Sequence, residues 1–417
     1  MNSNRPLRWV PTLYFDEALP YMAVMTLSVI MYTNLGLTNT QLALYTSWLY
    51  LPWVIKPLWS PLVDSLRTKR WWILVMQVLL GASLAGVALS LHTSLWLQGS
   101  LCLFWLMAFS SSTHDIAADG FYILGLNEQQ QALFVGVRST FYRIGSIFCQ
   151  GVLVMLAGWL QNKYEVNVAW SLTMFFLAAI LILLSLWHTR ALPKVENQDE
   201  TSSDKPQEGV FEAFSATLRA FFGKPHILVA LLFMLLFRLP EAQLAKMAQP
   251  FMLRSLNEGG LQMSTEAVGF IYGTIGVVSL LLGGLLGGYV VSKHGLRRWL
   301  WPMVLSISLP DLVYVYFAYA QPQNWLVLNG GVALEQFGYG FGFTAYMLYL
   351  VYFSRGERST SVFSLCTAFQ ALGMMFPGMA AGWLADTLGF ARFFVFVCIC
   401  CLVTFGVSAL IRIEDEK

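Results

Sequence analysis

The sequence predicts an all-α membrane protein with twelve transmembrane helices arranged in two six-helix bundles. Hydrophobic residues make up 57% of its 417 positions and charged residues only 12%, about half of the charge that a soluble domain carries. The apolar residues collect in twelve runs, and about 20 helical residues suffice to cross the hydrocarbon core of a bilayer. The longest polar stretch separates the first six runs from the last six.

The twelve runs are expected to be the membrane-spanning helices, with polar breaks between them. The first six lie at residues 10–33, 42–62, 72–92, 96–124, 133–160 and 168–188. The last six lie at residues 226–249, 265–291, 299–320, 324–352, 360–384 and 391–412. The eighth contains the glycine-rich segment SLLLGGLLGGYV (279–290), which predicts close packing against another helix.

Basic residues indicate the direction of the spans. If the N-terminus is cytoplasmic, seventeen Lys and Arg residues fall in cytoplasmic segments and three in outer loops or outer helix ends. Basic residues are enriched in the cytoplasmic loops of membrane proteins. Both termini are therefore expected in the cytoplasm.

The polar stretch 189–225 is charged, contains Pro and Ser, and is poor in apolar residues. It is predicted to be a cytoplasmic linker with a short surface helix at 210–222. The expected domains are thus an N-terminal bundle at 1–188, this linker, and a C-terminal bundle at 226–417. Two bundles joined in this way are the organisation of a transporter with parallel halves.

Two loops at corresponding places of the halves resemble each other. WSPLVDSLRTKRWW (59–72) follows the second run and GGYVVSKHGLRRW (287–299) follows the eighth. Both resemble the loop pattern of the major facilitator superfamily, although Ser292 replaces the acid in the second copy. The resemblance implies alternating access, with gating candidates in these loops: Asp64, Arg67, Arg70, Arg297 and Arg298.

Longer stretches resemble one branch of that superfamily. IKPLWSPLVD (55–64), SSSTHDIAADGF (110–121) and the region 335–386 are similar to AmpG-type muropeptide permeases and to the related acetyl-CoA transporters. The resemblance implies proton-coupled import of anhydro-muropeptides across a bacterial inner membrane. Siderophore permeases lie near the same branch, so the resemblance does not decide between an anhydro-muropeptide, acetyl-CoA and a siderophore as the substrate.

Two acids in the fourth run are expected to have different roles. Asp115 and Asp119 are four residues apart, about one turn on the same helix face. Counting outward from the loop between runs four and five puts Asp119 level with Arg138 and Asp115 level with Arg143. Asp119 is predicted to form a gating or structural ion pair with Arg138 or with the basic loop Arg67–Arg70. Asp115 either acts in the transport cavity or forms a static pair with Arg143.

Other carboxylates in the spans are candidates for proton coupling, because ionisable groups in a membrane are costly and usually functional. Asp16 and Glu17 lie three to four residues before Pro20, and their alternative is a solvated position at the interface. With Asp115 and Glu335 they form the set of proton-coupling candidates. Asp311 in the ninth run is a weaker candidate, because the resemblance implies that the third span of each six-helix half faces lipid or supports the bundle.

Basic residues within the spans favour a substrate with anionic character. Arg238 lies near the middle of the seventh run and can pair with Glu241 at i, i+3. Lys246, nearer the outer end, is expected to extend toward the interface. The substrate-binding candidates are Lys56, Arg143, Arg238, Glu241 and Tyr339.

Other classes of function find less support in the sequence. It contains no phosphate loop and no metalloprotease or hydrolase motif, and its five histidines are dispersed. No catalytic residue, metal site or cofactor is expected, and the six cysteines are predicted to be unpaired. A membrane enzyme and a non-transporting sensor are the alternatives. The expected partners are a small-molecule substrate, protons and the lipid bilayer, with no nucleic acid, and the protein is expected to be a monomer.

Overall fold

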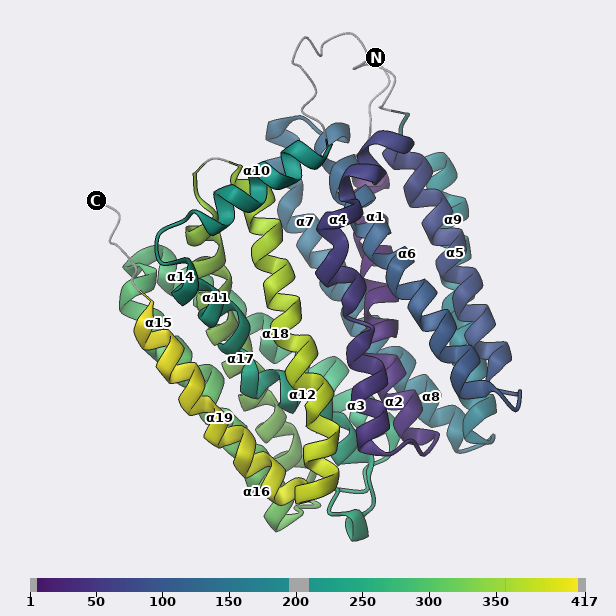
Figure 1. Ribbon diagram of the computed structural model, residues 1–417. Coiled ribbons are helices and arrows are strands. Elements are labelled where there is room, and N and C mark those ends of the chain that lie inside the picture. Colours follow the sequence, from purple (N-terminus) through teal and green to yellow (C-terminus); the bar gives the residue numbers. More distant parts are fainter. Residues whose placement is uncertain (1–5, 195–209, 357, 412–417) are drawn as a thin grey trace, which may run out of the picture. The chain divides into compact units, whose positions relative to one another are not determined.

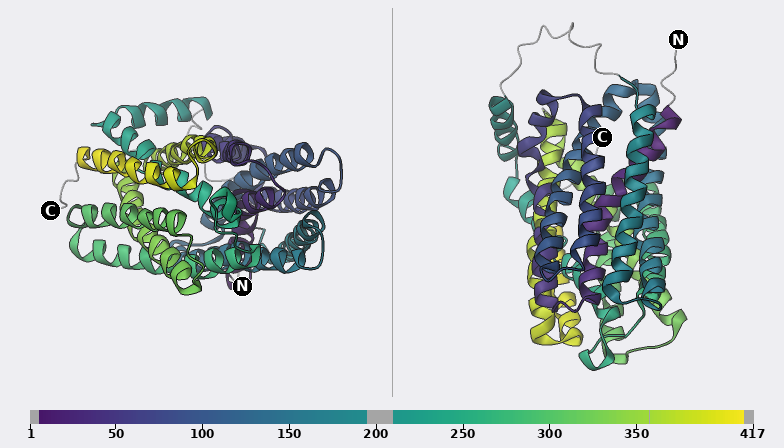
Figure 2. Two further views of the ribbon diagram at one scale, coloured as in Figure 1. Left: turned by 90° about the horizontal axis from the view of Figure 1, so that it is seen from below. Right: turned by 90° about the vertical axis from the view of Figure 1, so that its right-hand side faces the viewer.

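The computed structural model describes residues 6–194, 210–356 and 358–411, and within these ranges the elements are helices joined by turns (Figure 1). Twelve long helical rods follow one another along the described chain, and neighbouring rods within each part pack against each other (Figure 2). The predicted all-α fold with twelve spans is confirmed. The rods agree with the predicted runs to within a few residues, except where helices extend into the loops.

The first six rods include three that are interrupted. Their elements are α1 (Val10–Met22), η2, a π-helical turn (Ala23–Leu27), and α2 (Ser28–Asn34); α3 (Asn39–Trp48) and α4 (Leu51–Leu66); α5 (Lys69–Ser90); α6 (Trp96–Gly125); α7 (Glu128–Ile147), η3 (Phe148–Leu153) and α8 (Val154–Gln161); and α9 (Val166–Ala191).

The last six rods follow α10 (Val210–Phe222), the helix predicted in the linker. Their elements are α11 (Ile227–Leu236) and α12 (Leu239–Leu253); α13 (Thr265–Phe270), η5 (Ile271–Gly276) and α14 (Val277–His294); α15 (Leu296–Ser308), η6 (Leu309–Asp311) and α16 (Leu312–Ala320); α17 (Trp325–Ser354); α18 (Ser359–Leu388); and α19 (Phe390–Leu410).

Local sequence explains where the rods begin and break. The hydroxyls of Thr38 and Thr68 cap α3 and α5 by accepting a hydrogen bond from a backbone N–H of the first turn. Pro240 stands at the start of α12 and Pro310 in the break before α16, because proline cannot donate the hydrogen bond that continues a helix.

The described chain forms two compact units. The first consists of the residues up to Ser28 and those from Ile55 to Val210, and the second of Val29–Val54 and the residues from Phe211 onward. The segment Val29–Val54, the adjoining ends of the first two rods, therefore packs with the second half of the chain. The first unit has a core around Trp9 and Phe121.

The surface of both units is strongly apolar. Leu183 of the first unit is 65% exposed, and Leu285 and Leu326 of the second are 71% and 80% exposed. In the described part of the chain, nine rods are long and apolar enough to cross a membrane by composition alone. The other three are 39–66, 96–125 and 325–354, which contain Lys56, Asp115 and Glu335. The first of these is broken into α3 and α4, of 10 and 16 residues, and ionisable side chains such as those in the other two are typical of helices that line a polar interior.

The glycine-rich segment of the eighth rod packs as predicted. A Cβ atom on Gly283 of α14 would overlap the carbonyl oxygen of Phe337, and one on Gly340 of α17 would overlap that of Leu280. Only glycine permits this approach of two helix backbones. The six cysteines are all unpaired, as predicted, although Cys102 is exposed.

Candidate functional site

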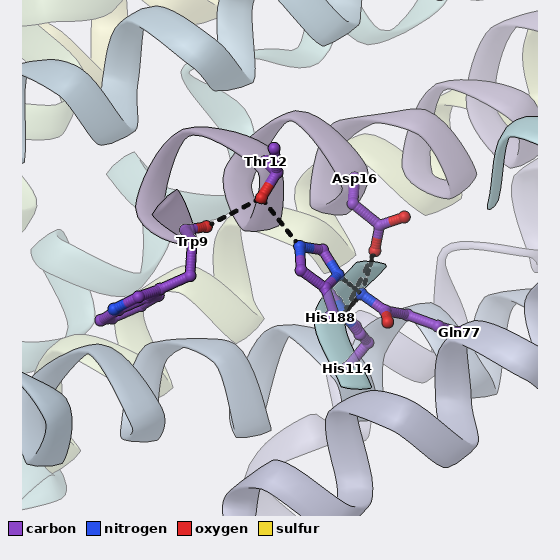
Figure 3. A network of polar contacts seen from close by, with 6 residues as sticks. All are labelled: Trp9, Thr12, Asp16, Gln77, His114 and His188. Carbon is purple, nitrogen blue, oxygen red and sulfur yellow. Dashed lines mark hydrogen bonds and ion pairs between the residues drawn. The ribbon is translucent and has the colours of Figure 1, made fainter. Parts of the chain in front are cut away.

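A buried polar network joins four helices of the first unit (Figure 3). Asp16 of α1 and Gln77 of α5 meet His114 of α6 and His188 of α9, and all four side chains are 0% exposed. Gln77 Nε2 lies 2.7 Å from Asp16 Oδ2 and 2.8 Å from His188 Nδ1. His114 Nε2 lies 3.4 Å from Asp16 Oδ2.

These distances define a consistent set of donors and acceptors. The Gln77 amide donates one hydrogen to Asp16 and the other to His188 Nδ1, because an amide nitrogen only donates. His188 Nε2 then carries a hydrogen and donates it to the hydroxyl of Thr12, 2.9 Å away. That hydroxyl donates to the carbonyl oxygen of Trp9 at 3.2 Å. His114, with its hydrogen on Nε2, donates to Asp16.

The network is well suited to hold one exchangeable proton. The only titratable group that pairs with Asp16 in the described chain is His114, and neither lysine nor arginine contacts it. Asp16 Oδ1 and His114 Nδ1 are buried without a hydrogen-bond partner among the described residues. A buried carboxylate without a cation is costly, and a proton bound to Asp16 or shared with His114 removes that cost.

A second, more exposed cluster lies in the same unit. Lys56 Nζ lies 3.8 Å from Asp115 Oδ2, and Arg138 Nη2 lies 2.5 Å from Asp119 Oδ1. Glu17 is buried, 7% exposed, and interacts electrostatically with all four of these groups. The cluster therefore contains three acids and two bases, so that one acid has no basic partner of its own.

Each of the two acids of α6 has a basic partner in the structure. Arg138 pairs with Asp119, as predicted, and its guanidinium also lies over the ring of Tyr14, 4.3 Å from the centroid. Arg143 forms no ion pair in the described part of the chain, and Asp115 pairs with Lys56 of α4 instead. The physical reason is that Arg138 and Arg143 are five residues apart, about 140° around one helix.

The second unit contains a buried ion pair near the break between α11 and α12. Arg238 Nε and Nη2 donate to the two carboxylate oxygens of Glu241, each at 2.6 Å. Nη2 also donates to the hydroxyl of Tyr339 on α17 at 2.9 Å. The guanidinium lies 4.7 Å from the ring centroid of Phe343. The three predicted candidates Arg238, Glu241 and Tyr339 thus lie together.

Glu335 and Asp311 are the other buried acids of this unit, 6% and 4% exposed. Glu335 accepts a hydrogen bond from Gln336 at 2.9 Å, and Tyr314, 3.5 Å away, also donates to it. Asp311 interacts electrostatically with Glu335 and lies 3.6 Å from Cys401 Sγ. Asp311 lies in the short break η6 and is buried against α19.

The gating candidates in the two loops differ in their contacts. Arg70 donates to the carbonyl oxygens of Thr189 and Leu192 at the end of α9, an arrangement that satisfies helix-terminal acceptors. Arg67 lies over the ring of Trp71, and Arg297 and Arg298 are exposed. The side chain of Asp64 lies outside the described part of the structure.

Sequence reasoning missed three members of the buried network: Gln77, His114 and His188. His114 points about 100° away from Asp115 on the same helix, and that is why it reaches Asp16 on α1 instead. Gln77 and His188 carry no local motif. The available signal was a glutamine and a histidine inside otherwise apolar spans.

Comparisons with known proteins agree with this architecture. The chain is 26% identical over 349 residues to the anhydromuropeptide permease of Escherichia coli (strain K12), covering 82% of this chain and 67% of the permease. It is 24% identical to a putative transporter, AmpG 4, of Rickettsia conorii, covering 84% and 83% of the two chains. The predicted resemblance to AmpG-type permeases is confirmed.

A solved structure shows the fold. The crystal structure of the nucleoside transporter NupG superposes with a TM-score of 0.72 at 15% identity, covering 99% of this chain and 100% of that one. The described rods therefore form the major facilitator fold. The model of the BT1 family matches residues 19–319, more than half of the sequence, and the chain belongs to the BT1 family.

Proposed function

We propose that the chain is a secondary transporter that imports an anionic solute across a bacterial inner membrane by alternating access, driven by protons. The observation that carries the proposal is the buried Asp16 network: a carboxylate that contacts His114 and Gln77, which themselves lie 3.3 Å apart (Nε2 to Nε2), with no lysine or arginine contact among the described residues. A proton that binds there from one side of the membrane and leaves to the other would couple its gradient to solute movement. Both termini would be cytoplasmic.

The solute is proposed to be an anhydro-muropeptide. The support is the name of the Escherichia coli relative together with basic groups inside the spans. Arg143 is half-buried and forms no ion pair in the described chain, and Lys56, with a side chain 29% exposed, pairs with Asp115. Such cations suit the carboxylates of a peptide, and aromatic side chains such as Tyr339 suit sugar rings. Siderophores and acetyl-CoA are the alternatives to be tested.

Uptake into proteoliposomes tests this function directly. With a more acidic exterior, we expect saturable accumulation of labelled anhydro-muropeptide, and without a pH gradient only equilibration. Unlabelled anhydro-muropeptide should compete, whereas a ferric siderophore and acetyl-CoA should not. Saturable uptake that ignores the gradient would contradict proton coupling, and competition by one of the other two compounds would reassign the substrate.

Replacing Asp115 with Asn should abolish most uptake while the protein remains folded and extractable. The reason is that Asp115 would then no longer hold the Lys56 ammonium, 3.8 Å away. The measurement is initial uptake by the purified variant, with Lys56→Met/Asp115→Asn as the matched control. If the pair is only a scaffold, neutralising both partners should restore uptake. A double variant as inactive as the single one supports a direct role for the two charges.

A further inference from the structure

Lys246 lies in α12 and is 7% exposed. The expectation that its side chain extends to the interface is wrong, because it turns inward toward α3 instead. Its ammonium donates to the hydroxyl oxygen of Thr46 at 3.0 Å and lies 5.7 Å from the ring centroid of Tyr50. The Thr46 hydroxyl can accept this bond, since its own hydrogen goes to the carbonyl oxygen of Leu42 at 2.7 Å.

This environment leaves the charge poorly compensated. An ammonium has three hydrogens to donate, and Thr46 accepts only one of them. Lys246 forms no ion pair with any carboxylate among the described residues. A buried charge is usually paired because removing it from water is costly. The conformation described here therefore carries a desolvation free-energy cost, and an anion beside the Lys246 ammonium would offset it.

The groups that cover the ammonium, Thr46 and Tyr50, come from Val29–Val54, which we call the lid. The lid packs with the second unit, although it belongs to the first two rods. One irregular place in the helices precedes it, the π-helical turn Ala23–Leu27, and another lies inside it near its end, the break at Leu49 and Tyr50 before Pro52. Such interruptions are the usual sites of helix bending.

The lid packs along α18, and specific contacts fix its position there. Asp386 at the end of α18 accepts hydrogen bonds from the backbone N–H of Thr40 at 2.8 Å and from its hydroxyl at 2.6 Å. A Cβ atom on Gly382, one turn earlier, would overlap the carbonyl oxygen of Asn39. Arg254 of α12 donates to the carbonyl oxygen of Leu37. Leu42 and Ala43 of the lid are fully buried, so opening of the lid must also separate the close packing of α3 against α18.

We propose that Lys246 binds an anionic group of the substrate, a carboxylate in a peptide-bearing solute, and that the lid covers this binding point in the conformation described here. The inference rests on the proposed transport of an anionic solute. Opening of the lid on the expected outer side uncovers the ammonium, and the arriving carboxylate replaces Thr46 as its partner. Lys246 thus favours the open lid and selects for negative charge.

The test compares a charged substrate with a neutral one. Initial uptake into proteoliposomes is measured for anhydro-muropeptide and for the same compound with its carboxyl groups amidated. For Lys246→Met we expect the KM of the free acid to rise about tenfold or more, which is one lost interaction of about 1.4 kcal/mol, and the KM of the amidated compound to change little. Lys246→Arg should retain the preference, and Lys163→Met, the same change at an exposed outer lysine, should behave as wild type.

The possible results are separable. If wild-type protein takes up neither compound, the proposed function fails. If wild-type uptake is normal but Lys246→Met raises both KM values equally or neither, the inference is overturned and Lys246 has only a packing role.

A second measurement tests the lid without reference to substrate selectivity. A disulfide formed between Thr40→Cys and Asp386→Cys should stop uptake, and reduction should restore it, whereas either single variant should be insensitive to oxidation. Full uptake activity of the oxidised double variant, with the disulfide verified by mass spectrometry, would contradict the proposal that the lid opens during transport.

Discussion

Replacing Asp16 with Asn should abolish the accumulation of labelled anhydro-muropeptide against its gradient. In a one-to-one symport each pH unit across the membrane supports about tenfold accumulation, since a factor of ten corresponds to about 1.4 kcal/mol. The variant should only equilibrate the solute, whatever the gradient. Asparagine can still accept the hydrogen bond that Gln77 donates to Asp16 Oδ2 at 2.7 Å, so the fold should be retained while the proton site is lost.

The matched measurement for this variant is exchange of labelled for unlabelled solute without a pH gradient. Exchange needs substrate binding and alternation but no net proton movement, so it should continue in Asp16→Asn. His114→Gln, which keeps a donor near Asp16 but cannot be protonated, should shift the pH dependence of uptake rather than abolish it. Gradient-driven accumulation by Asp16→Asn at the wild-type level would contradict the assignment of the network as the proton site.

The spans were predictable because burial in lipid demands a long apolar helix, and this signal is local in the sequence. The ion pair of Asp119 with Arg138 and that of Arg238 with Glu241 were also predictable, from depth and from i, i+3 spacing. In both cases the geometry of one helix or of two helices joined by a short loop was sufficient.

The buried network was not predictable, because no signal local in the sequence specifies it. Asp16, Gln77, His114 and His188 come from four helices, and which faces of those helices meet depends on packing between distant parts of the sequence. Lys246 is a similar case. Its burial depends on Thr46, 200 positions away in the sequence, in a segment whose sequence position gives no sign that it packs with the second half.

The structure also changes how the acids in the spans are compared. Glu17, Asp115 and Asp119 share two basic partners, whereas among the described residues Asp16 contacts His114 and the amide of Gln77. An acid with a basic partner is held ionised by that partner, and an acid without one is neutralised most easily by a proton. This difference in partners, rather than depth in the membrane, is the reason that we propose Asp16 as the proton site.

Replacing Glu241 with Ala should give the largest loss of stability among these variants. Arg238 would remain buried, at 6% exposure, with its two 2.6 Å hydrogen bonds to the carboxylate removed. Leaving one member of a buried pair uncompensated costs about 3–5 kcal/mol, and the midpoint of thermal unfolding in detergent should fall by about 10 °C. Glu266→Ala, the same change at an exposed acid, should leave the stability within about 0.5 kcal/mol of wild type.

The double variant Arg238→Met/Glu241→Leu separates stability from function. Because buried pairs can be replaced by apolar residues of similar volume at little or no cost, it should recover most of the thermal midpoint lost in Glu241→Ala. Uptake should stay low, since the guanidinium that the hydroxyl of Tyr339 contacts at 2.9 Å is gone. Wild-type uptake by the double variant would show that the pair is a structural element, and a thermal midpoint of Glu241→Ala equal to that of Glu266→Ala would show that Arg238 finds other partners.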